Sequence, residues 1–336
     1  MRLRGQWTRV TLGAFVVAAA SACAGGAGDE PAAKRASSSS TSAAPVQTET
    51  SVQTGSVDAE IPVGAGPGAI AVGGGAVWVK NLLDETVSRI DPSTNKVVAT
   101  IPIGRGQFGY LTYGERAVWA TNNDANTVSR IDPRTNRVVA TIRVGSNPQG
   151  IAVGAGAAWV ANHRSASLSR IDTRTNRVTE TIRLPSDPQA VAADESAVWV
   201  GLAGDGLVLR LDPRSGKVAA RIPVDGACGR LVLSPDAVWV TSGCEDDTTV
   251  IRIDRRAEEA AAEVDVGGAG LGIALGLGSV WAALPSTGSV VRIDPKKNAV
   301  AETISLEAAA FVAVGHGAVW VSNDAAYTVL RLAPGR

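Results

Sequence analysis

The chain carries no excess of charge and shows no helical pattern. Its 336 residues include 32 Lys and Arg and 32 Asp and Glu, so the formal net charge is zero. That balance argues against a nucleic-acid-binding protein held by a general basic surface. No segment sustains a 3.6-residue hydrophobic period, and the apolar residues come in short, often alternating runs. These absences favour an all-β domain.

Motifs that carry chemistry are also lacking. The sequence has no phosphate-binding loop, no metal-ligand spacing and no nucleophile–base set. Cysteine occurs three times, and the three residues do not share one role. We therefore expect no metal, no cofactor and no catalytic residue. Aromatic residues make up 4% of the chain, and most of the large ones are tryptophans.

Seven of these tryptophans recur at a nearly constant interval. Gaps of 41, 40, 40, 40, 42 and 39 residues separate Trp78, Trp119, Trp159, Trp199, Trp239, Trp281 and Trp320. A fixed period near forty residues indicates a repeat architecture. In the repeat 149–184, the runs 150–154, 157–162, 167–172 and 177–184 read as four short strands separated by turn residues. Four strands per repeat describe the blade of a β-propeller, so seven repeats predict seven four-stranded blades.

The ends of the domain predict how the ring closes. The last repeat lacks a fourth strand, because the chain stops soon after residues 328–332. Residues 57–63 match the fourth strands of other repeats, so we expect them to complete the seventh blade. This pairing removes the open edges that a linear array would leave. The domain is thus predicted to span residues 56–336.

Two recurring residue types have a structural interpretation. The turn between the third and fourth strands begins with an aspartate and ends with Asn or Gly, as in Asp132–Asn136 and Asp172–Asn176. Such residues stabilise a tight turn, so these aspartates are not interpreted as a metal ring. The tryptophans lie on second strands, where large side chains fill the space between sheets. The helix-like run 257–262 is expected to be an irregular turn.

The N-terminus predicts export. Arg2, Arg4 and Arg9 precede a short apolar run at 10–20, which fits a signal peptide over residues 1–22. The small residues before Cys23 resemble a bacterial lipobox, in which the cysteine is lipidated. The alternative is a plain secretory signal with a chance cysteine. Residues 23–55 are rich in Ser, Ala and Thr and are expected to form a disordered tether. We expect an extracytoplasmic protein anchored to the bacterial cell membrane.

The repeats resemble a known propeller family. Segments such as Trp159-Val-Ala-Asn, Trp119-Ala-Thr-Asn and Trp320-Val-Ser-Asn stand beside Val128-Ser-Arg-Ile-Asp-Pro-Arg-Thr-Asn. This pattern resembles the YVTN family of β-propeller repeats, with Trp in place of the family's Tyr. The resemblance covers roughly residues 57–336. It implies an exported propeller and does not name an activity.

A second, more distant resemblance is to streptogramin (virginiamycin B) lyase, another seven-bladed propeller with tryptophan-bearing repeats. That family places Glu after the second strand, and its chemistry needs His, Glu and a divalent metal on one face. The matching positions here hold Asn81, Asn122, Asn162, Leu202, Ser242, Leu284 and Asn323. His163 follows a second strand and His316 lies in a hairpin between first and second strands, so the two emerge on opposite faces.

One face of the predicted ring gathers polar side chains. The loops after second and fourth strands open on this face, which we call the top. Candidate ligand-binding residues on its rim are Asn81, Arg105, Gln107, Asn122, Asn123, Asn147, Gln149, Asn162, His163 and Gln189. Amides bind neutral polar groups but do not readily act as general acids or bases. Each Asn has the alternative role of simply ending its strand.

The fifth repeat departs from the common spacing. Trp239 and Asp254 are 15 residues apart, against 13 in the other repeats, and the longer loop contains Cys244. Cys228 begins the first strand of the same repeat. Because the ends of an antiparallel hairpin meet, and because an exported domain meets an oxidising compartment, we expect a Cys228–Cys244 disulfide. The alternative is two free buried thiols.

These features predict an exported, lipid-anchored propeller that acts as a ligand- or protein-binding or scaffolding module. The expected partner is a small polar ligand or an extracytoplasmic protein, with contact to the membrane only through the lipid and none with nucleic acid. We expect a monomer. The alternative is a metal-dependent enzyme of the lyase or lactonase type that uses the top face.

Overall fold

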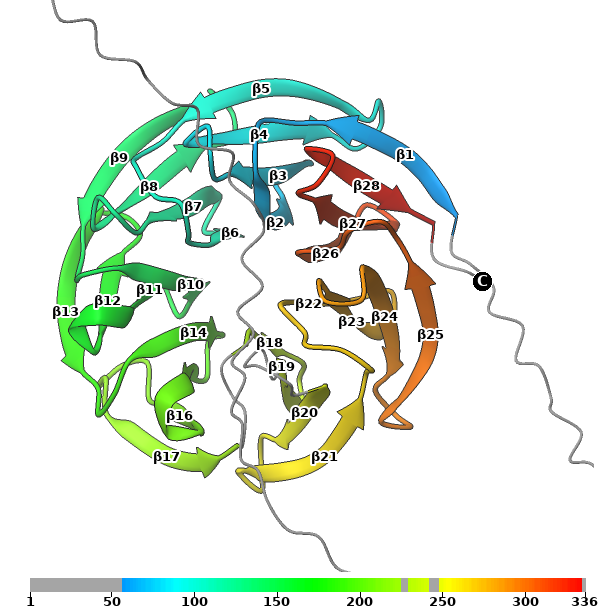
Figure 1. The fold of residues 1–336 in the computed structure, drawn as a ribbon. Helices are drawn as coiled ribbons and strands as arrows, with labels where there is room; N and C mark the ends of the chain where they lie inside the picture. Colours follow the sequence, from blue (N-terminus) through cyan, green and yellow to red (C-terminus); the bar gives the residue numbers. More distant parts are fainter. Residues whose placement is uncertain (1–55, 225–228, 242–247, 334–336) are drawn as a thin grey trace, which may run out of the picture. The chain divides into compact units, whose positions relative to one another are not determined.

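Seven four-stranded antiparallel sheets form a ring around an open axis (Figure 1). The computed structural model describes residues 56–224, 229–241 and 248–333. The compact unit Ser51–Arg336 contains all of them. This architecture confirms the predicted all-β, seven-bladed propeller with four strands per blade. The signal peptide, Cys23 and the tether lie outside the described residues and stay predictions.

Each blade takes four consecutive strands, except the last. The first blade consists of β2 Pro67–Gly73, β3 Ala76–Asn81, β4 Thr86–Asp91 and β5 Lys96–Pro102. The second consists of β6 Leu111–Gly114, β7 Ala117–Asn122, β8 Thr127–Asp132 and β9 Arg137–Arg143. The third consists of β10 Pro148–Gly154, β11 Ala157–Asn162, β12 Ser167–Asp172 and β13 Arg177–Arg183. The fourth blade consists of β14 Pro188–Ala193, β15 Val198–Leu202, β16 Leu207–Leu211 and β17 Val218–Pro223. The fifth consists of β18 Leu231–Leu233, β19 Ala237–Thr241, β20 Thr249–Asp254 and β21 Glu259–Asp265. The sixth consists of β22 Gly272–Gly276, β23 Ser279–Leu284, β24 Ser289–Asp294 and β25 Ala299–Ser305. The seventh consists of β26 Val312–Gly315, β27 Ala318–Asn323, β28 Thr328–Leu332 and β1 Val57–Pro62. Two 3₁₀ turns, His163–Ser165 and Ala203–Asp205, follow β11 and β15. In the described residues, no helix has the length and apolar character to cross a membrane.

The first strand closes the ring. β1 pairs antiparallel with β28, from Val57 opposite Leu332 to Pro62 opposite Thr328, with a register shift between Val57 and Ala59 (Figure 1). Ile61 points into the core and is 2% exposed. It packs in one cluster with residues of the first and last blades, among them Val77 and Trp320. The predicted closure by residues 57–63 is therefore confirmed.

The periodic tryptophans fill the spaces between neighbouring blades. All seven are buried, and each belongs to a hydrophobic cluster with residues of adjacent sheets. In five blades the indole Nε1 donates to the carbonyl of a glycine five residues earlier, as from Trp159 to Gly154 at 3.2 Å. A glycine suits this position because a Cβ on Gly154 would lie 2.8 Å from the backbone of Ala193. The tryptophans are thus core residues, as predicted.

The turn aspartates serve their own turns. Asp172 accepts hydrogen bonds from the backbone N–H and hydroxyl of Thr175, at 2.7 and 2.9 Å. The pKa of the Asp172 carboxyl lies below its usual value chiefly because the backbone N–H of Thr175 donates to it. The turn ends on Asn176, whose φ of 59° is in the left-handed region that Asn tolerates.

These turns also tie the blades together. The guanidinium of Arg89 in the first blade donates to Oδ1 of Asn136 in the turn of the second, at 2.8 Å. Arg130 reaches Asn176 in the same way, at 3.1 Å. Arg331 of the last blade reaches Asn95 of the first, at 3.2 Å. The joint that closes the ring therefore has the same bond as two of the joints within it.

For the fifth blade, the expected irregular turn at 257–262 is wrong, and the expected disulfide involves residues outside the described ones. Residues 255–258 form an ordinary turn and β21 begins at Glu259, so 257–262 is not an irregular turn. Glu258 takes the left-handed position, with φ 56°, that Asn occupies elsewhere. Pairing with β20 overrides the helix propensity of the alanines. Cys228 and Cys244 lie outside the described residues, so their disulfide stays a prediction.

Candidate functional site

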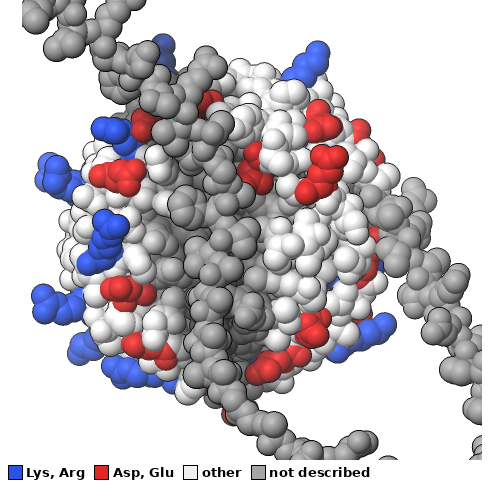
Figure 2. Space-filling view, in the orientation of Figure 1, with Lys and Arg blue, Asp and Glu red and all other residues white. Residues whose placement is uncertain are grey.

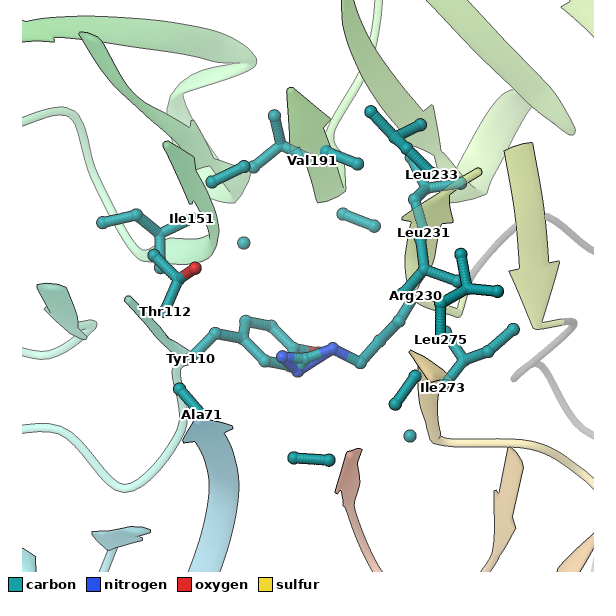
Figure 3. A pocket seen from close by; sticks show the side chains of 18 of the residues that line it. Ala71, Tyr110, Thr112, Ile151, Val191, Arg230, Leu231, Leu233, Ile273 and Leu275 are labelled. Atoms are coloured by element: carbon teal, nitrogen blue, oxygen red, sulfur yellow. The ribbon is translucent and has the colours of Figure 1, made fainter. Parts of the chain in front are cut away.

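The ring encloses a central channel with a volume of about 750 Å³. Its wall comes from the first strands of all seven blades. These are the edge strands of their sheets, so a row of their backbone N–H and C=O groups has no partner strand. Aliphatic side chains share the wall, among them Ile151, Val191, Leu231 and Ile273 (Figure 3). The wall thus offers a ligand both backbone polar groups and apolar side chains, a combination found in small-molecule sites.

Three large side chains stand at one repeated position near the top of this channel. The residue nine places before the periodic tryptophan is small in four blades: Ala69, Gly150, Ala190 and Gly272. In the other three blades it is Tyr110, Arg230 and Phe311. Each of these three precedes the first strand of its blade and lies on the wall of the channel.

A hydroxyl on the second strand fixes the backbone of each large residue. The N–H of Tyr110 donates to Thr121 Oγ1 at 2.7 Å. The N–H of Arg230 donates to Thr241 Oγ1 at 2.8 Å, and that of Phe311 to Ser322 Oγ at 3.0 Å. The blades with a small residue have Lys, Ala or Gly in place of this hydroxyl. The large residue and the hydroxyl therefore occur together.

The three side chains meet across the channel. The Arg230 guanidinium lies 3.8 Å from the ring centroid of Tyr110 and 5.2 Å from that of Phe311. The two rings make an edge-to-face contact, with centroids 6.1 Å apart. Figure 3 shows Tyr110 and Arg230 reaching toward each other from opposite walls. We call Tyr110, Arg230 and Phe311 the crossbar.

Two arginines line the described part of the channel, and they differ in pairing. Arg255, near the bottom, donates to Asp194 and to the backbone carbonyl of Ser234. No acidic side chain pairs with Arg230 in the described residues, and its Nη1 is buried without a hydrogen-bond partner. Burial lowers the pKa of Arg230 to about 10, so it remains a cation at neutral pH. Within the part of the chain that the structure describes, the crossbar therefore holds a positive charge without an acidic partner.

A buried lysine positions the loop that carries Tyr110. Lys80, fully buried on β3, donates from Nζ to the carbonyls of Phe108 and Thr121, both at 2.7 Å. Phe108 in turn donates its N–H to Asn123 Oδ1 at 3.2 Å. The Phe108 side chain itself, two residues before Tyr110 in the chain, is 68% exposed. The first and second blades are thus joined beside the channel mouth.

Replacing Lys80 with Met is expected to change how stability depends on pH. Burial lowers the pKa of Lys80 from 10.5 to about 7. Above pH 7 the unfolded chain then holds a proton on this group that the folded chain has released, so stability rises with pH up to about 10.5. From pH 7 to pH 10, the free energy of unfolding of the unsubstituted protein should therefore increase relative to that of Lys80→Met. Urea titrations of both proteins at pH 7 and pH 10 measure this. If the free energy of unfolding changed equally in the two proteins between these pH values, the prediction would be contradicted.

The structure places three of the predicted rim asparagines inside the blades. Asn81, Asn122 and Asn162 are fully buried at the ends of their second strands. The side-chain amide of each donates to two hydroxyls of the next strand, as Asn162 does to Ser167 and Ser169 at 3.2 and 2.9 Å. Their Oδ1 atoms are buried without partners. These amide groups fasten the second strand to the third.

Most of the other predicted site residues lie in the top loops. Arg105 and Gln107 are exposed, and Arg105 lies 3.7 Å from Glu85. Gln149 donates to Asn147 at 3.1 Å, and the backbone N–H of His163 donates to the Asn147 carbonyl at 3.0 Å. Among the ten candidates, only Gln189 lines the channel. Ligand contact by any of the ten stays a prediction.

The residues of the crossbar were missed, although the sequence holds a signal for them. The repeats are recognised by the residues that recur, whereas Tyr110, Arg230 and Phe311 replace a small residue at one repeated position. Aligning the repeats on their tryptophans exposes these departures. The paired departure to Thr or Ser two residues after the tryptophan is the second sign.

Charge is unevenly distributed around the outside of the ring. The outer strands β9 and β13 each begin and end on an exposed arginine, namely Arg137, Arg143, Arg177 and Arg183. The outer strand β21 instead begins and ends on exposed acidic residues. Figure 2 shows basic side chains along the left edge, where Figure 1 places β9 and β13. The outer surface thus carries a row of arginines along β9 and β13, whereas the ends of β21 are acidic.

Comparison with solved structures supports the fold. A structure of virginiamycin B lyase from Staphylococcus aureus matches 82% of this chain and 98% of its own, with a TM-score of 0.71 and 18% identity. A streptogramin B lyase structure matches 82% and 96%, with a TM-score of 0.69 and 17% identity. Hydrazine synthase of Kuenenia stuttgartiensis matches 81% and 97%, with a TM-score of 0.68 and 16% identity. Identity this low shows the fold alone.

Sequence comparison does not add a family. No family model matches the chain. No curated protein matches it either. The resemblance to YVTN repeats therefore stays a prediction, while the likeness to streptogramin B lyase holds for the propeller fold.

Proposed function

We propose that this protein is an exported, lipid-anchored binding module that takes a small ligand at the top end of its central channel, against the crossbar. The observation that carries the proposal is the Arg230 cation, which contacts two aromatic rings and has no acidic partner among the described residues. Leaving a buried polar group without a partner is costly, so a ligand that pairs with the Arg230 cation would offset part of that cost. Near the bottom of the channel, by contrast, Arg255 is neutralised by an ion pair with Asp194.

Export and the lipid anchor rest on the sequence of residues 1–23. The signal-peptide pattern and the small residues before Cys23 support them. In that location the ligand would be met outside the cytoplasmic membrane. The proposed module is monomeric, and its outer charged strands are solvated.

The alternative is a metal-dependent lyase, which the likeness in fold to streptogramin B lyase brings forward. The described residues do not fit the metal such an enzyme would need. They contain no group of three or more His, Cys, Asp and Glu side chains placed to hold an ion. His163 follows β11 at the top and His316 lies between β26 and β27 at the bottom. A binding role therefore has the better support.

The test is direct binding of an uncharged probe with a flat apolar body. Isothermal titration calorimetry with 2-naphthamide should show saturable binding to one site per chain. Tyr110→Ala should weaken it about three- to tenfold, because aromatic pairs are worth ~0.5–1.5 kcal/mol beyond the area they bury. Tyr327→Ala is the matched control, since Tyr327 is an exposed tyrosine of a top loop and does not line the channel.

Two results would overturn this function. One is the absence of saturable binding for both 2-naphthamide and its acid, 2-naphthoate. The other is a tightly held divalent ion, detected by metal analysis and bound by two or more protein carboxylates. That finding would favour the lyase alternative.

A further inference from the structure

We infer that the ligand of the channel is an organic monoanion with an apolar body, and that Arg230 binds its anionic group, a carboxylate being the simplest case. This inference rests on the proposed binding function and names the chemical class of the ligand. It follows from three features of the channel: the donors left on Arg230, the number of cations, and the nature of the wall.

Stacking leaves the hydrogen-bonding edge of Arg230 available. The guanidinium carries five N–H donors, all in its plane, and has no acceptor. With its Cζ 3.8 Å from the Tyr110 ring centroid, the group uses a face of its plane for the ring and keeps its edge free. Its side chain makes no hydrogen bond or ion pair with any described residue. Nη1 is withdrawn from water, so the donors that a ligand can reach are those on Nε and Nη2. A planar carboxylate matches such an edge with two parallel hydrogen bonds.

The count of cations indicates a single negative charge. Besides Arg230, the described lining of the channel contains one basic residue, Arg255, and Asp194 neutralises it. Lys80 is close to the loop of Tyr110, but its Nζ already donates to two backbone carbonyls. A nucleotide or other polyanion would bring charges that no described residue of the channel could meet. Within the described lining, Arg230 is the one basic side chain without an acidic partner, which favours a monoanion.

Apolar side chains of the channel wall can contact the body of such a ligand. Ile151, Val191, Leu231, Leu233 and Ile273 lie around it in Figure 3. Phe311 adds an aromatic edge next to the guanidinium. Apolar groups removed from water by such a wall contribute binding energy in proportion to their area. The anionic group would be held at the crossbar while the body fills the upper channel.

The experiment compares 2-naphthoate with 2-naphthamide, which share a body and differ in charge. Isothermal titration calorimetry at neutral pH should show the acid binding about tenfold or more tightly than the amide, as expected for charge-assisted hydrogen bonds. Arg230→Met should abolish that preference, and Arg230→Lys should retain part of it. Arg183→Met is the matched control, because Arg183 is exposed on the outer strand β13. It should keep the full preference.

The outcomes separate the inference from the function beneath it. Equal affinity of the acid and the amide for the unsubstituted protein overturns the inference and leaves the binding function standing. A preference that persists in Arg230→Met also overturns it, because another group would then bind the anion. Failure of both probes to bind overturns the function itself. If Arg230→Met does not fold, the ratio measured on the unsubstituted protein, with Arg230→Lys, still decides.

Discussion

Deleting residues 56–62 is expected to abolish cooperative folding of the propeller. The deletion removes β1, and with it the ladder to β28 and the buried Ile61. Loss of a buried Ile side chain alone costs ~2–5 kcal/mol, and each backbone hydrogen bond contributes ~0.5–1.5 kcal/mol. A folded domain has only ~5–15 kcal/mol in total, so the deletion removes much of it. Urea unfolding followed by tryptophan fluorescence measures the loss.

The control for this deletion is a chain that begins at residue 51 and keeps β1. It should unfold at the same urea concentration as the full chain, since the unit Ser51–Arg336 contains every described strand. β28 would become an edge strand in the deleted chain and invite pairing with other molecules. Size-exclusion chromatography should therefore show aggregation. A monomeric deleted chain with unchanged stability would contradict the closure mechanism.

Trp159→Ala is expected to destabilise the ring by ~3–5 kcal/mol, the usual cost of truncating a large buried aromatic side chain. Trp159 is fully buried between the third and fourth blades, in a cluster with Leu168, Val191 and Val200. The substitution also removes the hydrogen bond to Gly154 and the stacking of Arg170, whose Cζ lies 5.4 Å from the indole centroid. Urea unfolding at neutral pH gives the change in free energy of unfolding.

Trp199 offers a matched comparison. Its indole Nε1 is buried without a partner, and Asp194 stands at the position that holds the accepting glycine in five other blades. Trp199→Phe therefore removes an unsatisfied donor, whereas Trp159→Phe breaks a hydrogen bond. Both leave a similar cavity, so Trp159→Phe should cost ~1 kcal/mol more. Equal costs would show that the indole hydrogen bonds contribute nothing.

The period of the tryptophans was sufficient to predict the ring. Each tryptophan marks a second strand, and seven marks with one missing strand determine both the number of blades and the closure. The turns were predictable for the same reason, since Asp172 and Asn176 act within five residues of each other. Interactions this local leave a strong signal in the sequence.

The candidate site was harder to predict because its parts are distant in the chain. Tyr110, Arg230 and Phe311 meet only because the ring brings three separate blades to one axis. Conversely, Asn81 and Asn162 were assigned to the rim although their amides lie inside a hairpin, because the sequence does not reveal where a strand-end side chain points. A repeat pattern describes what blades share, whereas a site depends on how a few of them differ.

The bond from Arg331 to Asn95 has a consequence for the order of the blades. It repeats the bonds of Arg89 to Asn136 and of Arg130 to Asn176, although it joins the two ends of the chain. The break in the polypeptide is therefore one of several chemically similar joints. Circular permutants, with the natural ends linked and new ends cut between other blades, should reach the same ring. The fold would then not depend on which blade begins the chain, and the crossbar would assemble from any starting blade.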